Sequence, residues 1–414
     1  MKSEIKQRII QLNNGEVPSG YEKTEFGIFP CDWVKDKAFG DLFDFYGGLG
    51  KSREELGKEG HAYLHYGDLH RGSFNVVSHA QYERLPKYDV TLKGREAYLM
   101  EDGDVAFLDA SEDLEGTSRS VLIDNPDNQP FIAGLHVIFG KAKNNSLEKW
   151  YKQYITVAES VRKQFQRLAS GFKVYGVTRE TLPKIQIAYP KSTNEQSKIA
   201  EILMKCDEAI ELQEQYIINL KKKKLSIMRT LFSFSNECIL PFKDVVKPHK
   251  YKKELQTSQY QETGSIPVVD QGKNKIVAYT DNKDYIISSP EKGLLLFGDH
   301  TTEVKYINYE FAVGGDGVKL FEEKVPYLLK YVYYYLITFP FLIEGYKRHY
   351  SILKNKPIKF PIREGKIDRK KMDEVVLILS RFDEMIDLHT TKMGELKKQR
   401  KALQQYLLNG IVRV

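Results

Sequence analysis

Hydrophobic residues recur at alternating spacings of three and four over two long stretches of this chain, and the two stretches resemble each other at an offset of 176 residues. The segment 207–212, Asp-Glu-Ala-Ile-Glu-Leu, falls on 383–388, Asp-Glu-Met-Ile-Asp-Leu. An apolar pattern repeated over several heptads is typical of a coiled coil. We therefore expect one long helix over about 194–233 and a second over about 370–408, ended by Asn409-Gly410 as its C-cap.

Both helices carry an apolar seam that is interrupted at matching places. The seam residues of the first helix include Ile199, Leu203, Ile210, Ile217, Leu220 and Leu231, and those of the second include Val375, Leu379, Phe382, Ile386, Leu396 and Leu403. Polar residues replace apolar ones at Gln213 and Lys224, and at the corresponding His389 and Arg400. A polar residue in such a seam usually sets register and partner. Because the interruptions are shared, we interpret the pattern as an internal repeat.

The regions before each helix alternate with a period of two and contain frequent Gly and Pro, which predicts strands. The clearest strand segments are 104–108, 134–139, 183–187, 266–269, 294–297 and 318–321. Each region has one internal helix, near 147–168 and 327–344, and a short amphipathic helix opens the chain. The expected organisation is a lead-in over 1–32, a strand-rich domain over 33–190, a spacer helix over 191–235, a second strand-rich domain over 236–364 and a C-terminal spacer helix over 365–414.

The two strand-rich regions also share short motifs, which indicates that they are diverged copies. The matched pairs are Phe39–Phe43 with Phe242–Val246, Phe131–Gly134 with Phe311–Gly314, Gly171–Lys173 with Gly345–Lys347, and Pro183–Ile185 with Pro357–Lys359. The predicted fold is therefore α+β, with two strand-rich domains separated by two long helices and related by a pseudo-two-fold axis.

Connectivity favours antiparallel packing of the long helices. About 38 residues of helix span roughly 57 Å, whereas a domain of about 120 residues is only ~30 Å across. The second domain links the end of the first helix to the start of the second, so those two ends must lie close together. The two domains are then expected at opposite ends of the helix pair. Two unlike heads at a fixed separation suit duplex DNA, where they would read an asymmetric, two-part sequence with an unread spacer.

Composition narrows the class of protein. A chain of 414 residues with 12% aromatic residues is long enough for two or more packed cores. Its net charge of +7 is compatible with a polyanionic partner, although charge alone is weak evidence. The 3 cysteines are scattered, which predicts neither a disulfide framework nor a zinc site. We see no signal peptide and no apolar run that could cross a bilayer, so we expect a cytoplasmic protein without a bound metal.

Three motifs carry a resemblance to a known family. The block 190–203 (Pro-Lys-Ser-Thr-Asn-Glu-Gln-Ser-Lys-Ile-Ala-Glu-Ile-Leu), followed by 207–212, resembles the central spacer of the specificity subunit of Type I restriction–modification enzymes. The opening from Pro18 to Trp33 is similar to the lead into that family's first target-recognition domain, and 407–414 resembles its C-terminal end. The likeness spans essentially the whole chain.

The resemblance implies a function and a set of partners. Each strand-rich domain would read one half of a bipartite, asymmetric target in double-stranded DNA. The helices would bind two copies of a methyltransferase (M) subunit that modifies adenine N6, and restriction (R) subunits with nuclease and translocase activity would join for cleavage. The resemblance implies no cofactor in this chain, because S-adenosylmethionine, ATP and Mg²⁺ would belong to the partner subunits.

The strongest DNA-contact candidates lie in loops after the internal helices, where basic and aromatic residues stand together. In the first domain they are Arg167, Ser170, Lys173 and Tyr175, and in the second Lys347, Arg348, His349 and Tyr350. Such residues serve phosphates and base edges. Further candidates in polar turns are Lys51, Arg53, His70, Arg71, Gln271, Lys273 and Asn274. A solvated basic loop or a plain surface turn remains an alternative for each group.

Three other motifs are better interpreted as structural features than as binding sites. Gly47–Ser52 looks like a phosphate-binding loop but has Phe45 where the motif needs glycine. The lysines 221–224 favour a solvated helix face over a DNA patch, and the tyrosines between 331 and 335 favour the core.

We also considered other classes of protein. The only Asn-Pro, Asn125-Pro126, is followed by Asp127, which disfavours a self-sufficient amino-methyltransferase, and no nuclease-like cluster stands out. We therefore expect a non-catalytic subunit. The alternative from another class is a two-headed coiled-coil adaptor or scaffold protein with no role at DNA. Steep weakening of DNA binding by salt would distinguish a specificity subunit from an adaptor.

Overall fold

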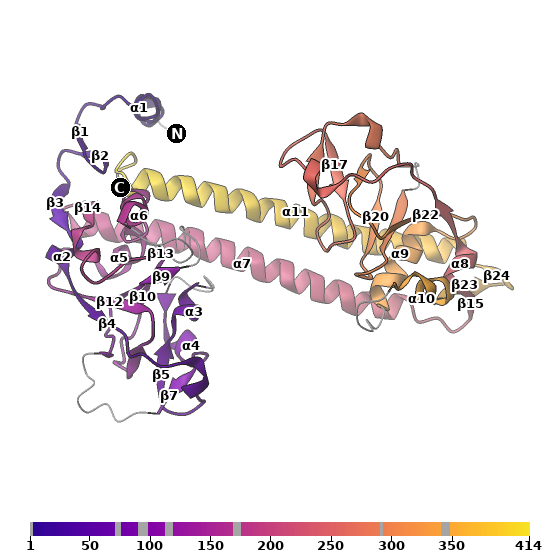
Figure 1. Cartoon of the computed structure of the whole chain (residues 1–414), viewed down its shortest axis with the longest axis horizontal. Helices are drawn as coiled ribbons and strands as arrows, with labels where there is room; N and C mark the ends of the chain where they lie inside the picture. Colours follow the sequence, from indigo (N-terminus) through magenta and orange to yellow (C-terminus); the bar gives the residue numbers. More distant parts are fainter. Residues whose placement is uncertain are drawn as a thin grey trace. The chain divides into compact units, whose positions relative to one another are not determined.

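The structure is a computed structural model of the whole chain that describes residues 3–70, 76–89, 98–111, 119–168, 175–289, 293–340 and 348–414. Its contacts divide the chain into two compact units. The first contains residues 1–212 together with 394–414, and the second contains residues 213–393. Each unit holds one strand-rich domain and a part of each long helix (Figure 1).

The first unit opens with a short helix and a hairpin that contact the end of the chain. The helix is α1 (Ser3–Asn13), and strands β1 (Tyr21–Thr24) and β2 (Gly27–Pro30) pair antiparallel. The Arg8 guanidinium donates a hydrogen bond to the Ile411 carbonyl at 2.6 Å, and the Tyr21 hydroxyl donates one to the Gly410 carbonyl at 2.5 Å. These contacts join the N-terminal lead-in to the C-terminal tail.

The first strand-rich domain is built around one five-stranded and one three-stranded sheet (Figure 1). Its elements are β3 (Val34–Ala38), α2 (Phe39–Leu42), β4 (Phe43–Gly47), β5 (His61–Leu64), α3 (Tyr66–His70), β6 (Val76–Val77), α4 (His79–Tyr82), β7 (Lys87–Tyr88), β8 (Val105–Leu108), β9 (Ala110–Ser111), β10 (Ser120–Ile123), β11 (Phe131–Ala133), β12 (Val137–Ala142), α5 (Lys149–Ile155), α6 (Glu159–Leu168), β13 (Tyr175–Gly176) and β14 (Gln186–Tyr189). The strand orders are β4-β12-β8-β10-β6 and β11-β5-β7, with β14–β3 and β13–β9 as separate pairs.

The second strand-rich domain has a four-stranded sheet and two three-stranded sheets. Its elements are β15 (Glu237–Pro241), α8 (Phe242–Val245), β16 (Val246–His249), β17 (Ile266–Val269), β18 (Ala278–Thr280), β19 (Leu294–Gly298), β20 (Val304–Ile307), β21 (Ala312–Val313), β22 (Val318–Glu323), α9 (Leu329–Thr338), α10 (Tyr350–Asn355), β23 (Pro357–Arg363) and β24 (Lys366–Ile367). The strand orders are β16-β22-β19-β20, β18-β17-β21 and β15-β23-β24.

The two domains share one strand connectivity. The order β4-β12-β8-β10 corresponds to β16-β22-β19-β20, with every neighbouring pair antiparallel. Strands β5 and β17 each have one parallel neighbour (β11 and β21) and one antiparallel neighbour (β7 and β18). The predicted match of the domain starts is confirmed, because α2 leads into β4 as α8 leads into β16. The domains are diverged copies of one fold.

One predicted match between the domains is wrong. The Phe39 amide donates to the Ile185 carbonyl at 2.8 Å, and the equivalent Phe242 amide donates to the Lys356 carbonyl at 2.9 Å. Ile185 therefore corresponds to Lys356, and Pro183 does not correspond to Pro357. The short motif misled because residues 182–184 form a 3₁₀ turn before the strand begins.

The internal helices are shorter than their patterns predicted. The stretch 147–168 is divided into α5 and α6, and Thr156 at the break turns its hydroxyl back to the Lys152 carbonyl at 2.8 Å. Such a bond competes with the regular helical pattern. Helix α9 stops at Thr338, close before Pro340, because proline disfavours helical geometry in the residue before it. Residues 341–347 lie outside the described part of the chain.

The two long helices are α7 (Thr193–Leu231, 39 residues) and α11 (Arg369–Leu408, 40 residues), close to the predicted bounds. They also begin alike, with the side chains of Ser192 and Asp368, 176 positions apart, accepting hydrogen bonds from backbone amides of the first turn. At the end of α11, Gly410 adopts a positive φ of 67°, as expected for a glycine C-cap.

The long helices pack antiparallel in each unit. In the first unit Ile199 and Leu203 of α7 share a core with Leu407 of α11, so the start of one helix meets the end of the other. In the second unit Met228 near the end of α7 shares a core with Met372 near the start of α11. The seam residues named above are all buried or half-buried. The α+β fold with paired antiparallel helices is therefore confirmed.

The shared interruptions of the seam form two copies of one polar contact. In the first unit the Asp207 carboxylate accepts hydrogen bonds from Arg400 at 2.8 Å and from the Tyr154 hydroxyl at 2.9 Å. In the second unit Asp383 accepts one from Lys224 and one from the Tyr334 hydroxyl at 2.7 Å. Each cation also lies over the ring of its tyrosine. The other two polar seam residues, Gln213 and His389, occupy equivalent positions of the repeat and contact each other. The Gln213 amide nitrogen lies 2.7 Å from the His389 ring nitrogen.

We predict that removing the Asp383 carboxylate destabilises the chain more than removing the charge of its buried partner, Lys224. Lys224 is only 9% exposed, whereas the side chain of Asp383 is 40% exposed. Asp383→Ala leaves a buried ammonium without its partner and should cost about 1–3 kcal/mol, below the value for a fully buried pair. Lys224→Met should stay within about 1 kcal/mol of the wild type, because it removes the charge and retains the packing.

Urea unfolding of both variants measures this difference. Asp387→Ala is the control on the same helix, because the Asp387 side chain is 72% exposed and pairs with Lys275 only at 3.7 Å. Equal stability of the Asp383→Ala variant and this control would contradict a structural role for the polar contact.

Candidate nucleic-acid interface

In the first domain, four loops meet at one edge of the sheets. The Gly134 amide donates to the Leu64 carbonyl at 2.9 Å, which joins the turn before β12 to the end of β5. The Asp109 amide donates to the His136 carbonyl at 3.3 Å, and the Val177 amide donates to the Asp109 carbonyl at 2.8 Å. These bonds bring together the loops after β5, β8, β11 and β13.

The second domain repeats the same backbone bonds. The Gly314 amide donates to the Val269 carbonyl at 3.0 Å, and the Asp299 amide donates to the Gly317 carbonyl at 2.8 Å. The His349 amide donates to the Asp299 carbonyl at 2.8 Å. The loops after β17, β19 and β21 and the segment before α10 therefore form the corresponding surface. Each domain has one candidate interface of the same backbone design.

Several predicted contacts of the first domain can be placed and several cannot. Arg167 is exposed at the end of α6, whereas Arg71, Ser170 and Lys173 lie outside the described residues, as do the side chains of His70 and Tyr175. Lys51 and Arg53 are described and both pair with acids: Lys51 with Glu55 at 2.8 Å and Arg53 with Asp68 at 3.0 Å. These acids offset part of the positive charge that the prediction relied on.

The glycine-rich loop 47–52 is held by its backbone. A Cβ at Gly48 would lie 1.8 Å from the Gly134 carbonyl oxygen, so only glycine fits there. The Lys51 amide donates to the Tyr63 hydroxyl at 3.0 Å, and that hydroxyl donates to the Leu49 carbonyl. The glycines thus serve close packing between the loops after β4 and β11.

In the second domain the polar turn after β17 reaches the candidate interface. The Gln271 side-chain oxygen accepts a hydrogen bond from the His300 amide at 3.2 Å, while Lys273 and Asn274 are exposed. The Lys305 ammonium donates to the Asn274 carbonyl at 2.6 Å, and burial lowers the pKa of Lys305. The hydrogen bond from the His300 amide to its side-chain oxygen holds Gln271 in place. Lys347 lies outside the described residues, Arg348 is exposed, and Tyr350 is half-buried.

The structure corrects the prediction for His349, which is fully buried. Its Nδ1 lies 3.1 Å from the Asp299 carbonyl oxygen, and its amide occupies the place that Val177 has in the first domain. Its side chain is packed inside the domain and is not available to DNA. The basic sequence around it gave no sign of burial, because the equivalence with an apolar residue appears only in the hydrogen-bond pattern.

Sequence reasoning missed a polar group at the interface of the first domain. His136 and Arg179 line a cavity of about 600 Å³ together with Tyr46, Tyr98 and Asp109. His136 has a φ of 58°, which is uncommon for a residue other than glycine. Burial raises the pKa of the Asp109 carboxyl, while His136 beside it acts in the opposite direction. Arg179 has no other basic or aromatic residue beside it in the sequence, so no local motif indicated a binding site there.

Two motifs of α7, the lysines 221–224 and the pair Glu195-Gln196, contain side chains that make contacts within the protein. Lys221, Lys222 and Lys223 are exposed, whereas Lys224 is buried in the seam, as its heptad position suggested. Glu195 accepts hydrogen bonds from Arg413 at 2.5 Å. Gln196 is fully buried and donates to the Ser146 and Pro190 carbonyls at 2.9 and 2.8 Å. The Glu-Gln pair thus fastens the start of α7 to its own unit.

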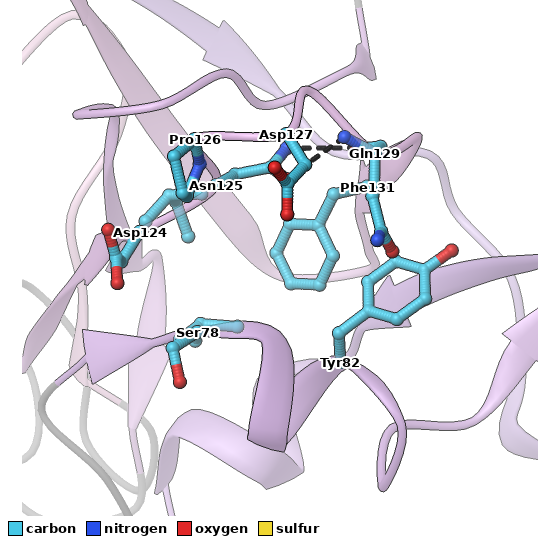
Figure 2. A pocket seen from close by; sticks show the side chains of 10 residues that line it. Ser78, Tyr82, Asp124, Asn125, Pro126, Asp127, Gln129 and Phe131 are labelled. Carbon is cyan, nitrogen blue, oxygen red and sulfur yellow. Dashed lines mark hydrogen bonds between the residues drawn. The ribbon is translucent and has the colours of Figure 1, made fainter.

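A second cavity lies beside the turn after β10, and its lining includes Asp124 and Asp127 (Figure 2). The Asn125 side chain closes this turn, accepting from the Gln129 amide at 3.0 Å and donating to the Gln129 carbonyl at 2.9 Å. Its amide is therefore engaged by the backbone. Asp124 and Asp127 line the same cavity, and Asp124 is paired with Lys149 at 2.6 Å. The charge of Asp127 disfavours a phosphate ligand.

Other expectations can be compared with the described residues. Tyr331, Tyr334 and Tyr335 are buried, in agreement with their assignment to the core. Within the described ranges, no three His, Cys, Asp or Glu side chains are placed to hold a metal ion. Among the helices described, none is long and apolar enough to span a membrane.

Comparisons with known proteins agree with the fold and with the sequence motifs. Residues 30–222 match the family described as Type I restriction modification DNA specificity domain. The EcoR124I/EcoR124II specificity subunit of Escherichia coli is 29% identical over 179 residues, which cover 41% of this chain and 44%, less than half, of that protein. The putative MjaX specificity subunit of Methanocaldococcus jannaschii is 22% identical over 430 residues, covering 95% of this chain and 97% of that protein.

Two solved structures share the fold at low sequence identity. The S subunit of a Type I restriction–modification system from M. genitalium has a TM-score of 0.56 and 15% identity, covering 91% of this chain and 96% of that one. A chain from a study of complex assembly and conformational transition of the type I R-M system has a TM-score of 0.55 and 13% identity, covering 96% and 100%.

We predict that two neighbouring residues of the second interface respond differently to replacement by alanine. Arg348 is exposed, so Arg348→Ala should weaken DNA binding and leave the melting temperature unchanged. His349→Ala removes a fully buried side chain and should cost about 1–3 kcal/mol of stability. Gel shifts and thermal melting measure the two effects. The corrected assignment would be refuted by a His349→Ala variant of unchanged stability and reduced DNA affinity.

Proposed function

Because this chain belongs to the specificity subunits of Type I restriction–modification systems, we propose that it reads a bipartite, asymmetric DNA site for such a complex. Each strand-rich domain binds one half of the site. Between the halves lies a spacer that is not read, and its length follows from the paired helices. Two adenine-N6 methyltransferase subunits dock on the chain, and nuclease/translocase subunits join them for cleavage.

The observation that carries this proposal is the pair of equivalent loop surfaces with different side chains. The loop after β5 presents Tyr66 where the loop after β17 presents Gln271, each two residues beyond a matched strand end. The turn before β12 presents His136 where the turn before β22 presents Gly317. Base edges are read by side chains, while a shared backbone sets the position of the reader. One backbone with two sets of side chains suits two unlike half-sites.

Exposed apolar residues on the long helices support the docking of two identical partners. Leu212 of α7 is 63% exposed and Leu388 of α11 is 67% exposed, and the two are 176 positions apart. Each leucine lies outside the seam that pairs the helices. A repeated apolar feature, once in each half of a duplicated chain, suits two copies of one methyltransferase.

We assign catalysis to the partners. In the part of the chain described here, the one Asn-Pro segment uses its asparagine to close a turn, so this amide does not serve a target base. S-adenosylmethionine, ATP and Mg²⁺ accordingly belong to the methyltransferase and nuclease subunits. This chain contributes recognition and position.

An exchange of domains tests the proposal. Replacing residues 33–190 with the corresponding domain of a relative should change one half of the methylated sequence and leave the other half and the spacer unchanged. The physical reason is that each domain has its own core and its own loop surface. Sequencing of N6-methyladenine in cells that express the chimera with its methyltransferase gives the result. A chimera that changes both halves, or a wild-type chain that directs no methylation, would overturn the assignment.

A further inference from the structure

The turn before β12 holds a histidine in a conformation that favours glycine. His136 has a φ of 58°, and the residue at the matching position of the second domain is Gly317, with a φ of 77°. The match follows from the backbone bonds that both residues accept, from Asp109 and from Asp299. Strained residues persist where the surrounding structure holds them, and they concentrate at functional sites. The backbone conformation at position 136 favours glycine, so we infer that the histidine is present for the function of its side chain.

The neighbours of His136 fix the orientation of its ring. Its Nδ1 lies 3.0 Å from the Asp109 carboxylate, and its ring meets that of Tyr66 edge to face at a centroid distance of 5.5 Å. A carboxylate accepts hydrogen bonds, so Nδ1 carries the proton and Nε2 is directed away from the acid. The side chain is 47% exposed, which leaves Nε2 accessible to a ligand.

Arg179 is the cation of this site. It lines the same cavity as His136 and is exposed, and a Cβ at Gly47 would lie 3.7 Å from its guanidinium. Among the residues that the structure describes, no acid lies within ion-pair distance of Arg179. An unpaired guanidinium retains all its donors for a ligand, and its fork matches the two acceptors, O6 and N7, of guanine in the major groove.

We propose that Arg179 and His136 form a base-reading site of the first domain, in which Arg179 binds the major-groove edge of a guanine and Asp109 orients His136 toward the adjacent base. The inference rests on the proposed function and adds to it a named base and named readers. The edge-to-face contact with Tyr66 holds the histidine ring in place. The half-site of the first domain contains a G·C pair for this reason.

The second domain lacks this site, which agrees with an unlike half-site. At the equivalent positions it has Gln271 for Tyr66 and Gly317 for His136. Two residues beyond the matched pair Val177 and His349, it has Ser351 in place of Arg179. Glutamine prefers adenine to guanine as a two-point partner. These few side chains therefore account for the difference between the two halves of the target.

Two variants of the full chain, each expressed with its methyltransferase, test the site through the methylated sequence. Arg179→Gln should lower the preference for guanine at one position of the first half-site by about tenfold to a hundredfold. His136→Gly should relax the preference at the adjacent position and leave the melting temperature equal or higher, because glycine adopts the positive φ without strain. If His136 serves only the structure, the His136→Gly variant loses its contacts with Asp109 and Tyr66, melts at a lower temperature and keeps the original target.

The controls separate failure of this inference from failure of the proposed function. Arg84→Gln removes an exposed arginine of the same domain and should leave the target unchanged. The second half-site should be the same in all variants. If the wild-type chain directs methylation to a bipartite site and both variants retain its first half, the inference is refuted while the proposed function stands. If the wild-type chain directs no such methylation, the proposed function itself fails.

Discussion

The polar contact between the long helices and the domains supports the rest of this structure. Asp207 binds Arg400 across the helix pair and Tyr154 of the first domain. Asp383 makes the same contact with Lys224 and with Tyr334 of the second domain. Each carboxylate therefore joins two helices and one strand-rich domain at a single point. An apolar seam alone could slide by a heptad at little cost, whereas a buried cation that must meet a carboxylate permits one register.

The distribution of charge along the helices also favours their antiparallel arrangement, in addition to the connectivity of the chain. The start of α7, over 193–212, has 5 acidic and 2 basic residues, whereas its remainder, over 213–231, has 1 acidic and 5 basic residues. The last part of α11, over 394–408, has 1 acidic and 4 basic residues. Antiparallel packing places the acidic start of α7 beside this basic end. A parallel pair would set the two basic ends side by side and repel. Glu195 in the first turn of α7 and Arg229 in its last turn also suit the dipole of that helix.

Periodicity predicted the long helices, their seams and the duplication, because long heptad patterns and shared interruptions are strong signals. It could not predict that the two domains have the same strand connectivity, because strands such as β5 and β17 pair with corresponding strands but have little sequence in common. The candidate surface was predicted in part. Gln271 and Arg348, which were predicted from composition, lie on the candidate surface and stay predictions as DNA contacts. His349 was assigned wrongly because burial leaves no mark in a basic loop, and His136 was not among the predicted residues. Its importance appears in a backbone angle, which a single sequence does not reveal.

We propose that the paired helices set the distance between two readers of DNA. Insertion of one heptad beside Gln213 and one beside His389 keeps the seam in phase and lengthens the pair by about 10 Å, close to the rise of about three base pairs. Sequencing of N6-methyladenine in cells expressing this variant with its methyltransferase measures the spacer directly. We expect the same two half-sites, separated by about three more base pairs. Two unchanged half-sites at the original spacing would contradict it.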